Sequence, residues 1–149
     1  MFDIFFSNWV DRDTLRNALS YAFDLATEDI LVLFDHSALL GLEREYKLIA
    51  FIYSTPSSQF PGLATINFDK SALVDTPNFS EIQAYHWHAN KLSQVLKCSC
   101  VIGDDDENPY TWILANYGDP PMSIIEVADE RADQGDFRIE RIVGEYQFE

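Results

Sequence analysis

The spacing of apolar residues predicts two helices in this chain. In residues 11–26 apolar side chains recur three and four positions apart, behind Asp11, which is a preferred N-cap residue. Residues 78–97 carry a second helical pattern, with Ser80 as the candidate cap. Its apolar positions form a single stripe made of Ile82, Tyr85, Ala89, Leu92 and Leu96. Each helix is therefore expected to bury one face against a core.

The remaining apolar runs have the length and composition of β-strands. They cover residues 2–6, 29–35, 46–53, 63–69, 98–103, 111–117, 123–128 and 137–142. The run 29–35 is apolar on both faces, which predicts a central strand of the sheet. No repeat or linker divides the chain. We therefore predict one α+β domain over residues 1–149, a mostly antiparallel sheet packed by two amphipathic helices.

Composition adds a strong negative charge to this picture. The 149 residues contain 25 acids against 10 Lys and Arg, giving a net charge of −15, and 47% of them are hydrophobic. The apolar content predicts a folded domain, whereas the charge repels nucleic acid and anionic membranes and favours a basic partner. The start MFDIFFSNWVDR shows no leader or anchor, and Cys98 and Cys100 are too close in sequence to be good disulfide partners. We expect a cytoplasmic protein.

The acids are concentrated in one part of the sequence. Ten acids between residues 101 and 137 stand against Arg131 alone, so this segment supplies −9 of the charge of −15. Two predicted strands separate the acids at 104–107 from those at 129–136, and a regular hairpin would return the chain to the same end of the sheet. We predict one acidic rim, with Tyr110, Trp112 and Tyr117 within or beside it, that binds a basic protein. A solvated edge that discourages strand aggregation would show the same pattern.

Trp87 is a further candidate for partner binding. At 100° per residue it lies nearly opposite the apolar stripe of its helix, among polar residues that include Lys91. Trp is enriched in interface anchors, but a loop such as residues 54–62 could equally cover it. The predicted partner-binding residues are Asp104, Asp105, Asp106, Glu107, Tyr110, Trp112, Tyr117, Asp119, Asp129, Glu130, Asp133 and Trp87.

Metal and catalytic motifs find little support. Asp104, Asp106 and Asn108 alternate like the start of an EF-hand loop, but Pro109 and Ala115 stand where that loop needs Gly and Glu. A looser acidic metal site stays open. His86 and His88 diverge on a helix, so each is expected to flank the apolar stripe with one nitrogen hydrogen-bonded. Nucleophile-elbow and phosphate-loop motifs are absent, and we expect no enzyme activity, no cofactor and no metal.

Small size, acidity, aromatic content and the run PYTWILANYGDPPMSIIEVADERADQGDFRIERI together carry a family resemblance. The chain resembles the immunity proteins of bacterial contact-dependent inhibition and other polymorphic toxin systems. The resemblance implies a cytoplasmic, stoichiometric inhibitor whose partner is a cognate basic toxin domain, such as a nuclease. We expect occlusion of the toxin's active site, with binding beside that site as the alternative. Two other functions stay open: a phage-type acidic inhibitor that imitates DNA, and a metal-dependent enzyme that uses the acidic cluster.

Overall fold

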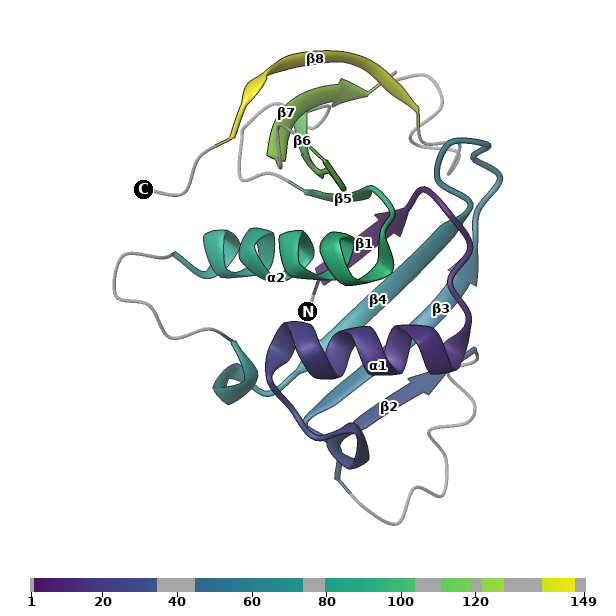
Figure 1. The fold of residues 1–149 in the computed structure, drawn as a ribbon, viewed down its shortest axis with the longest axis vertical. Coiled ribbons are helices and arrows are strands. Elements are labelled where there is room, and N and C mark those ends of the chain that lie inside the picture. Colours follow the sequence, from purple (N-terminus) through teal and green to yellow (C-terminus); the bar gives the residue numbers. More distant parts are fainter. Residues whose placement is uncertain are drawn as a thin grey trace.

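The computed structural model describes residues 2–34, 45–73, 80–103, 111–118, 122–127 and 138–146. It confirms the predicted α+β class, with two helices and a mostly antiparallel sheet (Figure 1). The elements are β1 (Phe2–Phe6), α1 (Arg12–Phe23), η1 (Thr27–Asp29), β2 (Ile30–Leu33), β3 (Leu48–Ser54), β4 (Gly62–Phe68), η3 (Lys70–Ala72), α2 (Glu81–Leu96), β5 (Cys100–Gly103), β6 (Thr111–Ala115), β7 (Met122–Val127) and β8 (Ile139–Glu145).

The eight strands form one sheet in the order β2-β3-β4-β1-β5-β6-β7-β8. The pairing of β2 with β3 is parallel, and the other pairings are antiparallel. The prediction that residues 29–35 form a central strand is wrong, because β2 is an edge strand. Its apolar run arises because Ile30 and Val32 are buried in the main core while the alternate residues are still half-covered.

Local signals set the helix ends. Asp11 Oδ1 accepts a hydrogen bond from the Thr14 backbone N–H at 2.8 Å. Helix α1 ends at Phe23, followed by the left-handed C-cap Asp24, rather than at residue 26. At the start of α2, Ser80 and Gln83 form a reciprocal capping box. The two helices lie side by side on the same face of the sheet (Figure 1).

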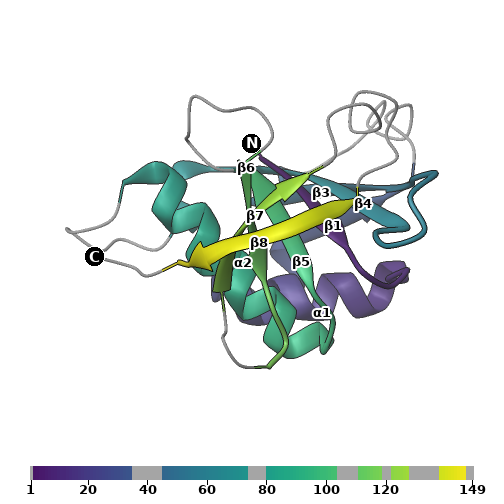
Figure 2. The same ribbon diagram turned by 90° about the horizontal axis from the view of Figure 1, so that it is seen from above.

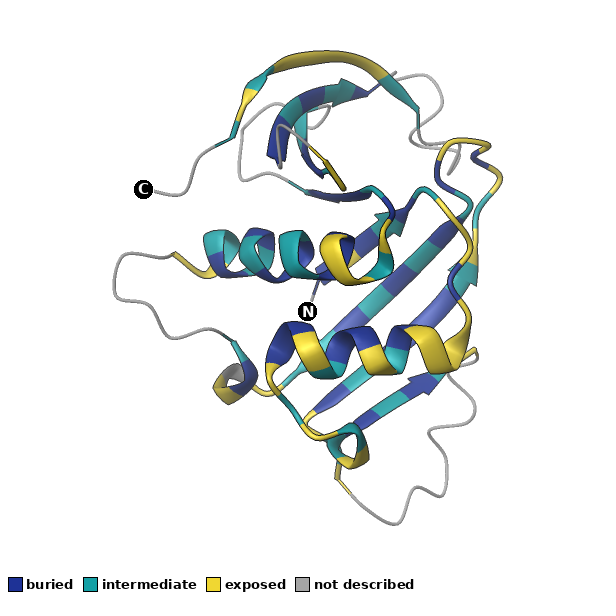
Figure 3. Cartoon of the chain, viewed as in Figure 1, coloured by how far each residue is buried: buried dark blue, intermediate teal, exposed yellow. Residues whose placement is uncertain are grey.

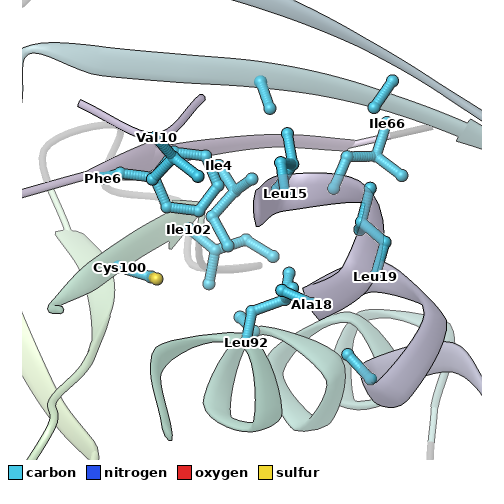
Figure 4. Close-up of a cluster of buried hydrophobic side chains, with 14 of the residues drawn as sticks. Ile4, Phe6, Val10, Leu15, Ala18, Leu19, Ile66, Leu92, Cys100 and Ile102 are labelled. Atoms are coloured by element: carbon cyan, nitrogen blue, oxygen red, sulfur yellow. The ribbon is translucent and has the colours of Figure 1, made fainter. Parts of the chain in front are cut away.

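The main core lies between these helices and the sheet. The side of α1 that faces the sheet is buried, whereas its outer side is exposed (Figure 3). Side chains from α1, α2 and the strands interdigitate in a dense cluster (Figure 4). Its labelled members are Ile4, Phe6, Val10, Leu15, Ala18, Leu19, Ile66, Leu92, Cys100 and Ile102.

A second, smaller apolar cluster lies on the opposite face of the sheet. Its buried members are Phe60, Val101, Leu114, Ile125 and Val127. Strands β5–β8 curl away from the other four strands, and β8 bends around the outside of β7 (Figures 1 and 2). Two register shifts in the β7–β8 pairing leave extra residues on β8, and such bulges increase local twist. The curl gives this half of the sheet a core of its own.

Candidate partner-binding surface

The β5–β8 meander gathers the strand ends from which both acidic segments start. β6 pairs with β7 without a register shift, so the regular hairpin that the sequence argument required is confirmed. The ends of β5 and β7 and the beginnings of β6 and β8 lie at one end of the meander. Because neighbouring strands are ~4.8 Å apart, these attachment points fall within ~15 Å of one another.

Most predicted partner-binding residues lie outside the part of the chain that the structure describes, so their placement on one rim stays a prediction. They are Asp104, Asp105, Asp106, Glu107, Tyr110, Asp119, Asp129, Glu130 and Asp133. Of the others, Tyr117 is 54% exposed and follows Ala115, the last residue of β6, at the opposite end of the meander. Tyr117 therefore lies away from the strand ends at which the two acidic segments begin. Because successive residues of a strand advance by ~3.3 Å, a five-residue strand separates its two ends by more than the reach of one side chain.

Trp112 stands at the end of the meander from which the acidic segments start. It is half-buried on the sheet face opposite the helices. Its ring makes an edge-to-face contact with Phe5, with 5.9 Å between ring centres and 81° between planes. The strand between them carries Gly103, where an added Cβ would stand 3.7 Å from the Trp112 ring. The ring therefore lies over the glycine and reaches across β5 to β1.

A notch opens beside Trp112, where β1 and β5 stop pairing. Their last paired residues are Ile4 and Ile102, although β1 begins at Phe2 and β5 continues to Gly103. The gap leaves a cavity of about 280 Å³, which we call the notch. Its lining residues are Phe2, Asp3, Ile82, Tyr85, Ile102, Gly103 and Trp112.

One carboxylate, Asp3, lines the notch, and a second, Glu81, is bonded to the lining residue Tyr85. Asp3 Oδ1 accepts a hydrogen bond from the Thr65 hydroxyl at 2.7 Å, which holds its side chain on the sheet face. On the helix side, the Tyr85 hydroxyl donates to Glu81. Burial, together with this hydrogen bond to Glu81, raises the pKa of Tyr85 to about 12. Tyr85 therefore stays a neutral donor at physiological pH, and the carboxylates give the notch a negative character.

Trp87 lies in a different environment, on the side of α2 that faces α1. It is half-buried and lines a cavity of about 520 Å³ together with Tyr21 of α1, Ala72 of η3, Leu73 and other residues. Lys91 Nζ is 4.1 Å from the centre of the Trp87 ring and 5.6 Å from that of Tyr21. The loop at 54–62 does not cover Trp87, because it buries Phe60 in the cluster on the far face. Trp87 and Trp112 therefore belong to separate surfaces.

Both histidines of α2 are buried and hydrogen-bonded, although His86 uses both ring nitrogens where the prediction had one. His86 Nε2 donates to the Gly103 carbonyl at 2.9 Å, so His86 Nδ1 accepts from the Tyr146 hydroxyl at 2.8 Å. His88 Nδ1 donates to the Ala22 carbonyl at 2.8 Å. Burial lowers the pKa of His88 to about 4. His86 thereby fixes the last residue of β5, directly before the acids at 104–107.

Other functional features are few within the described ranges. The two cysteines are free and buried in the main core. No group of three or more His, Cys, Asp or Glu residues that could hold a metal ion occurs among the residues described. Nor is any helix described in this structure long and apolar enough to cross a membrane.

Asp3 and Glu81 are absent from the partner-binding residues predicted from the sequence, and Tyr85 was predicted only as part of the apolar stripe. One signal was present: Glu81 precedes Tyr85 by four residues, which places the two on the same helix face. Asp3 had no such signal, because its proximity to Trp112 depends on β1 lying next to β5. Comparison of this chain with protein-family models, with curated proteins and with solved structures gave no match.

Proposed function

We propose that this protein is an immunity protein that binds and neutralises a cognate basic toxin domain in the cytoplasm. One observation carries the proposal: the regular β6–β7 hairpin starts both acidic segments from the same end of the meander. These segments belong to the region that supplies −9 of the −15 net charge. Trp112 and the notch, which are the aromatic and concave features of that end, give the surface an anchor beside the charge.

In the proposed mechanism, charge speeds association and aromatic packing slows dissociation. A toxin that grips phosphates presents Arg and Lys side chains, and an acidic inhibitor pairs with the groups that would otherwise hold the substrate. Complementary potentials raise the association rate to as much as ~10⁸ M⁻¹s⁻¹ at low salt. A desolvated aromatic anchor then slows dissociation, which is where most affinity differences arise. The inhibitor excludes the nucleic acid and performs no chemistry of its own.

The residue directly before the acidic segment is held in place by hydrogen bonds, which supports a role of the segment in binding. Gly103 directly precedes Asp104, and its carbonyl accepts a hydrogen bond from the buried ring of His86. The same glycine pairs with Trp112 in the β5–β6 ladder. Charge attached to a fixed strand end loses less conformational entropy when a partner binds than charge on a long free tail.

Charge reversal tests the proposal. The partner is the toxin domain encoded by the gene immediately upstream, measured by stopped-flow fluorescence over a range of salt concentrations. Replacing the four acids at 104–107 by Lys should reduce the association rate at least tenfold at low salt, and the loss should shrink as salt screens the charge. The control variant replaces Asp13, Asp24, Glu28 and Glu45 by Lys, which changes the net charge equally at exposed sites near α1 and β2.

The two variants separate local steering from overall charge. If both variants lost association rate equally, the acidic rim would have no special role. The effect would then come from the overall charge of the protein. Lack of binding between the wild-type protein and the neighbouring toxin, or lack of such a gene, would contradict the immunity function itself.

A further inference from the structure

We propose that the notch receives an arginine side chain of the partner. For the identity of that partner, the inference rests on the proposed function. The notch lies between the ends of β1 and β5, with Trp112 and Asp3 on one side and Tyr85 on the other. Nothing in the sequence pattern brings these residues together; the order of the strands does.

The size and walls of the notch suit a long side chain with a charged end. Its volume of about 280 Å³ exceeds the space that one such side chain needs and leaves room for ordered water. Phe2, Ile82 and Ile102 supply apolar walls for an aliphatic stem. Long cationic side chains bury their stems along such walls while their heads reach polar partners.

The chemistry of the notch selects a cation. The face of an indole ring attracts a guanidinium group, and a carboxylate can accept two parallel hydrogen bonds from it. The notch offers both, in Trp112 and in Asp3, and Glu81 adds a second negative charge on the helix side through its bond to Tyr85. Asp3 uses Oδ1 for Thr65, and among the described residues its Oδ2 accepts no hydrogen bond. No Lys, Arg or His lines the notch among the residues described.

Arginine fits this site better than lysine for a geometric reason. Its guanidinium is planar, stacks on an aromatic ring and bonds a carboxylate at the same time, whereas the lysine ammonium is a compact and strongly hydrated charge. Stacking on Trp112 and pairing with Asp3 would use both properties. The site adjoins Gly103, the residue before the acids at 104–107, so an arginine held there would lie at the base of the proposed interface.

Nuclear magnetic resonance with N-acetyl-L-arginine methylamide as the probe tests the site without any toxin. The chain has three tryptophans, so three indole N–H signals can be followed together, and Trp112→Phe assigns one of them. At millimolar probe we expect a saturable shift of the Trp112 signal only. The citrulline analogue, which has the same shape but no charge, should give no shift. The lysine analogue should give a weaker one.

Asp3→Asn supplies the matched variant, because an amide oxygen can still accept the hydrogen bond from Thr65 while the charge is lost. It should fold normally and abolish the response of Trp112 to the arginine probe. Equal shifts with arginine and citrulline, a response of Trp87 instead of Trp112, or an unchanged response in Asp3→Asn would each overturn the proposal.

The same variant extends the test to the neighbouring toxin. Asp3→Asn should weaken toxin binding at least tenfold, mainly through faster dissociation, whereas Asp13→Asn should not. If Asp3→Asn bound the toxin with wild-type affinity, the notch would not be part of the interface. The proposal of an acidic rim would be unaffected. Failure of the proposed immunity function would give a different result, because the wild-type protein itself would not bind the toxin.

Discussion

Trp112 and Trp87 are both half-buried and were both predicted to anchor a partner, yet the structure surrounds them with opposite charge. Trp112 shares the notch with Asp3 and lies beside the strand end that leads into the acids at 104–107. Trp87 carries Lys91 on its ring, at 4.1 Å from the ring centre. A ring already covered by an ammonium group gains nothing from a second cation and repels it. Neighbouring charge therefore decides which aromatic residue can serve a basic partner.

The two regions also differ in what holds them. Around Trp87 the support is a buried histidine, since His88 stacks on Phe23 with 3.9 Å between ring centres and an angle of 8°. Around Trp112 the support is the β-ladder and the small second cluster on the far face. The Trp87 region therefore packs on a buried histidine ring, whereas near Trp112 the buried His86 acts through its hydrogen bond to the Gly103 carbonyl.

The largest expected effect follows from His88. Its pKa is about 4 in the folded protein, against an ordinary value of 6.5. Below pH 6.5 the unfolded chain binds the proton first, so the free energy of unfolding falls as the pH drops from about 6.5 to about 4 and this contribution is then exhausted. We expect a loss of roughly 3 kcal/mol from this group over that interval. Urea unfolding at a series of pH values measures it.

His88→Gln is the control for that experiment, because the amide can donate to the Ala22 carbonyl but does not titrate. The wild-type protein and the variant share all carboxylates, so the difference between their curves isolates His88. A difference that stays constant from pH 7 to pH 4 would contradict the assigned pKa.

The sequence predicted the elements well and their neighbours less well. The helices and strands arise from local periodicity, and Asp11 and Ser80 cap the helices as their residue types predict. The edge position of β2 was missed because an apolar run reports only that both faces are covered in part. Strand order depends on which distant segments meet, and periodicity carries no information about that.

For the candidate site the sequence supplied the charge and one aromatic residue. The spacing of Trp87 and Lys91, four residues apart on a helix, already indicated a contact between them, but we weighed Trp87 for its exposure alone. Trp112 and Asp3 line the same notch although they are far apart in the chain, because β1 lies next to β5. The notch exists because that pairing ends early, and no local pattern records where a ladder stops.

The next largest expected effect is a difference in stability between variants that lack Trp112 and variants that lack Trp87. Trp112→Ala removes a ring that packs on Phe5 and the far-face cluster, and we expect a loss of about 2 kcal/mol. Trp87→Ala removes a ring that borders an open cavity and should cost less than ~1 kcal/mol. Differential scanning calorimetry measures both variants. Equal losses would mean that Trp87 contributes to packing as much as Trp112 does.

The smallest expected effect tests whether Lys91 is what disqualifies Trp87. Lys91→Glu should lower stability by only ~0.5–1 kcal/mol, the amount that a half-exposed cation–π contact contributes. It also places a carboxylate beside Trp87 and Tyr21, as Asp3 lies beside Trp112. The Trp87 indole signal should then respond weakly to N-acetyl-L-arginine methylamide, whereas we expect no response of that signal in the wild-type protein. Lys97→Glu, which makes the same charge change at the exposed C-cap of α2, should leave that signal unchanged. If the Trp87 signal in Lys91→Glu did not shift with the arginine probe, the charge of the notch would not be what makes Trp112 the better anchor. The concave shape of the notch would then be the cause.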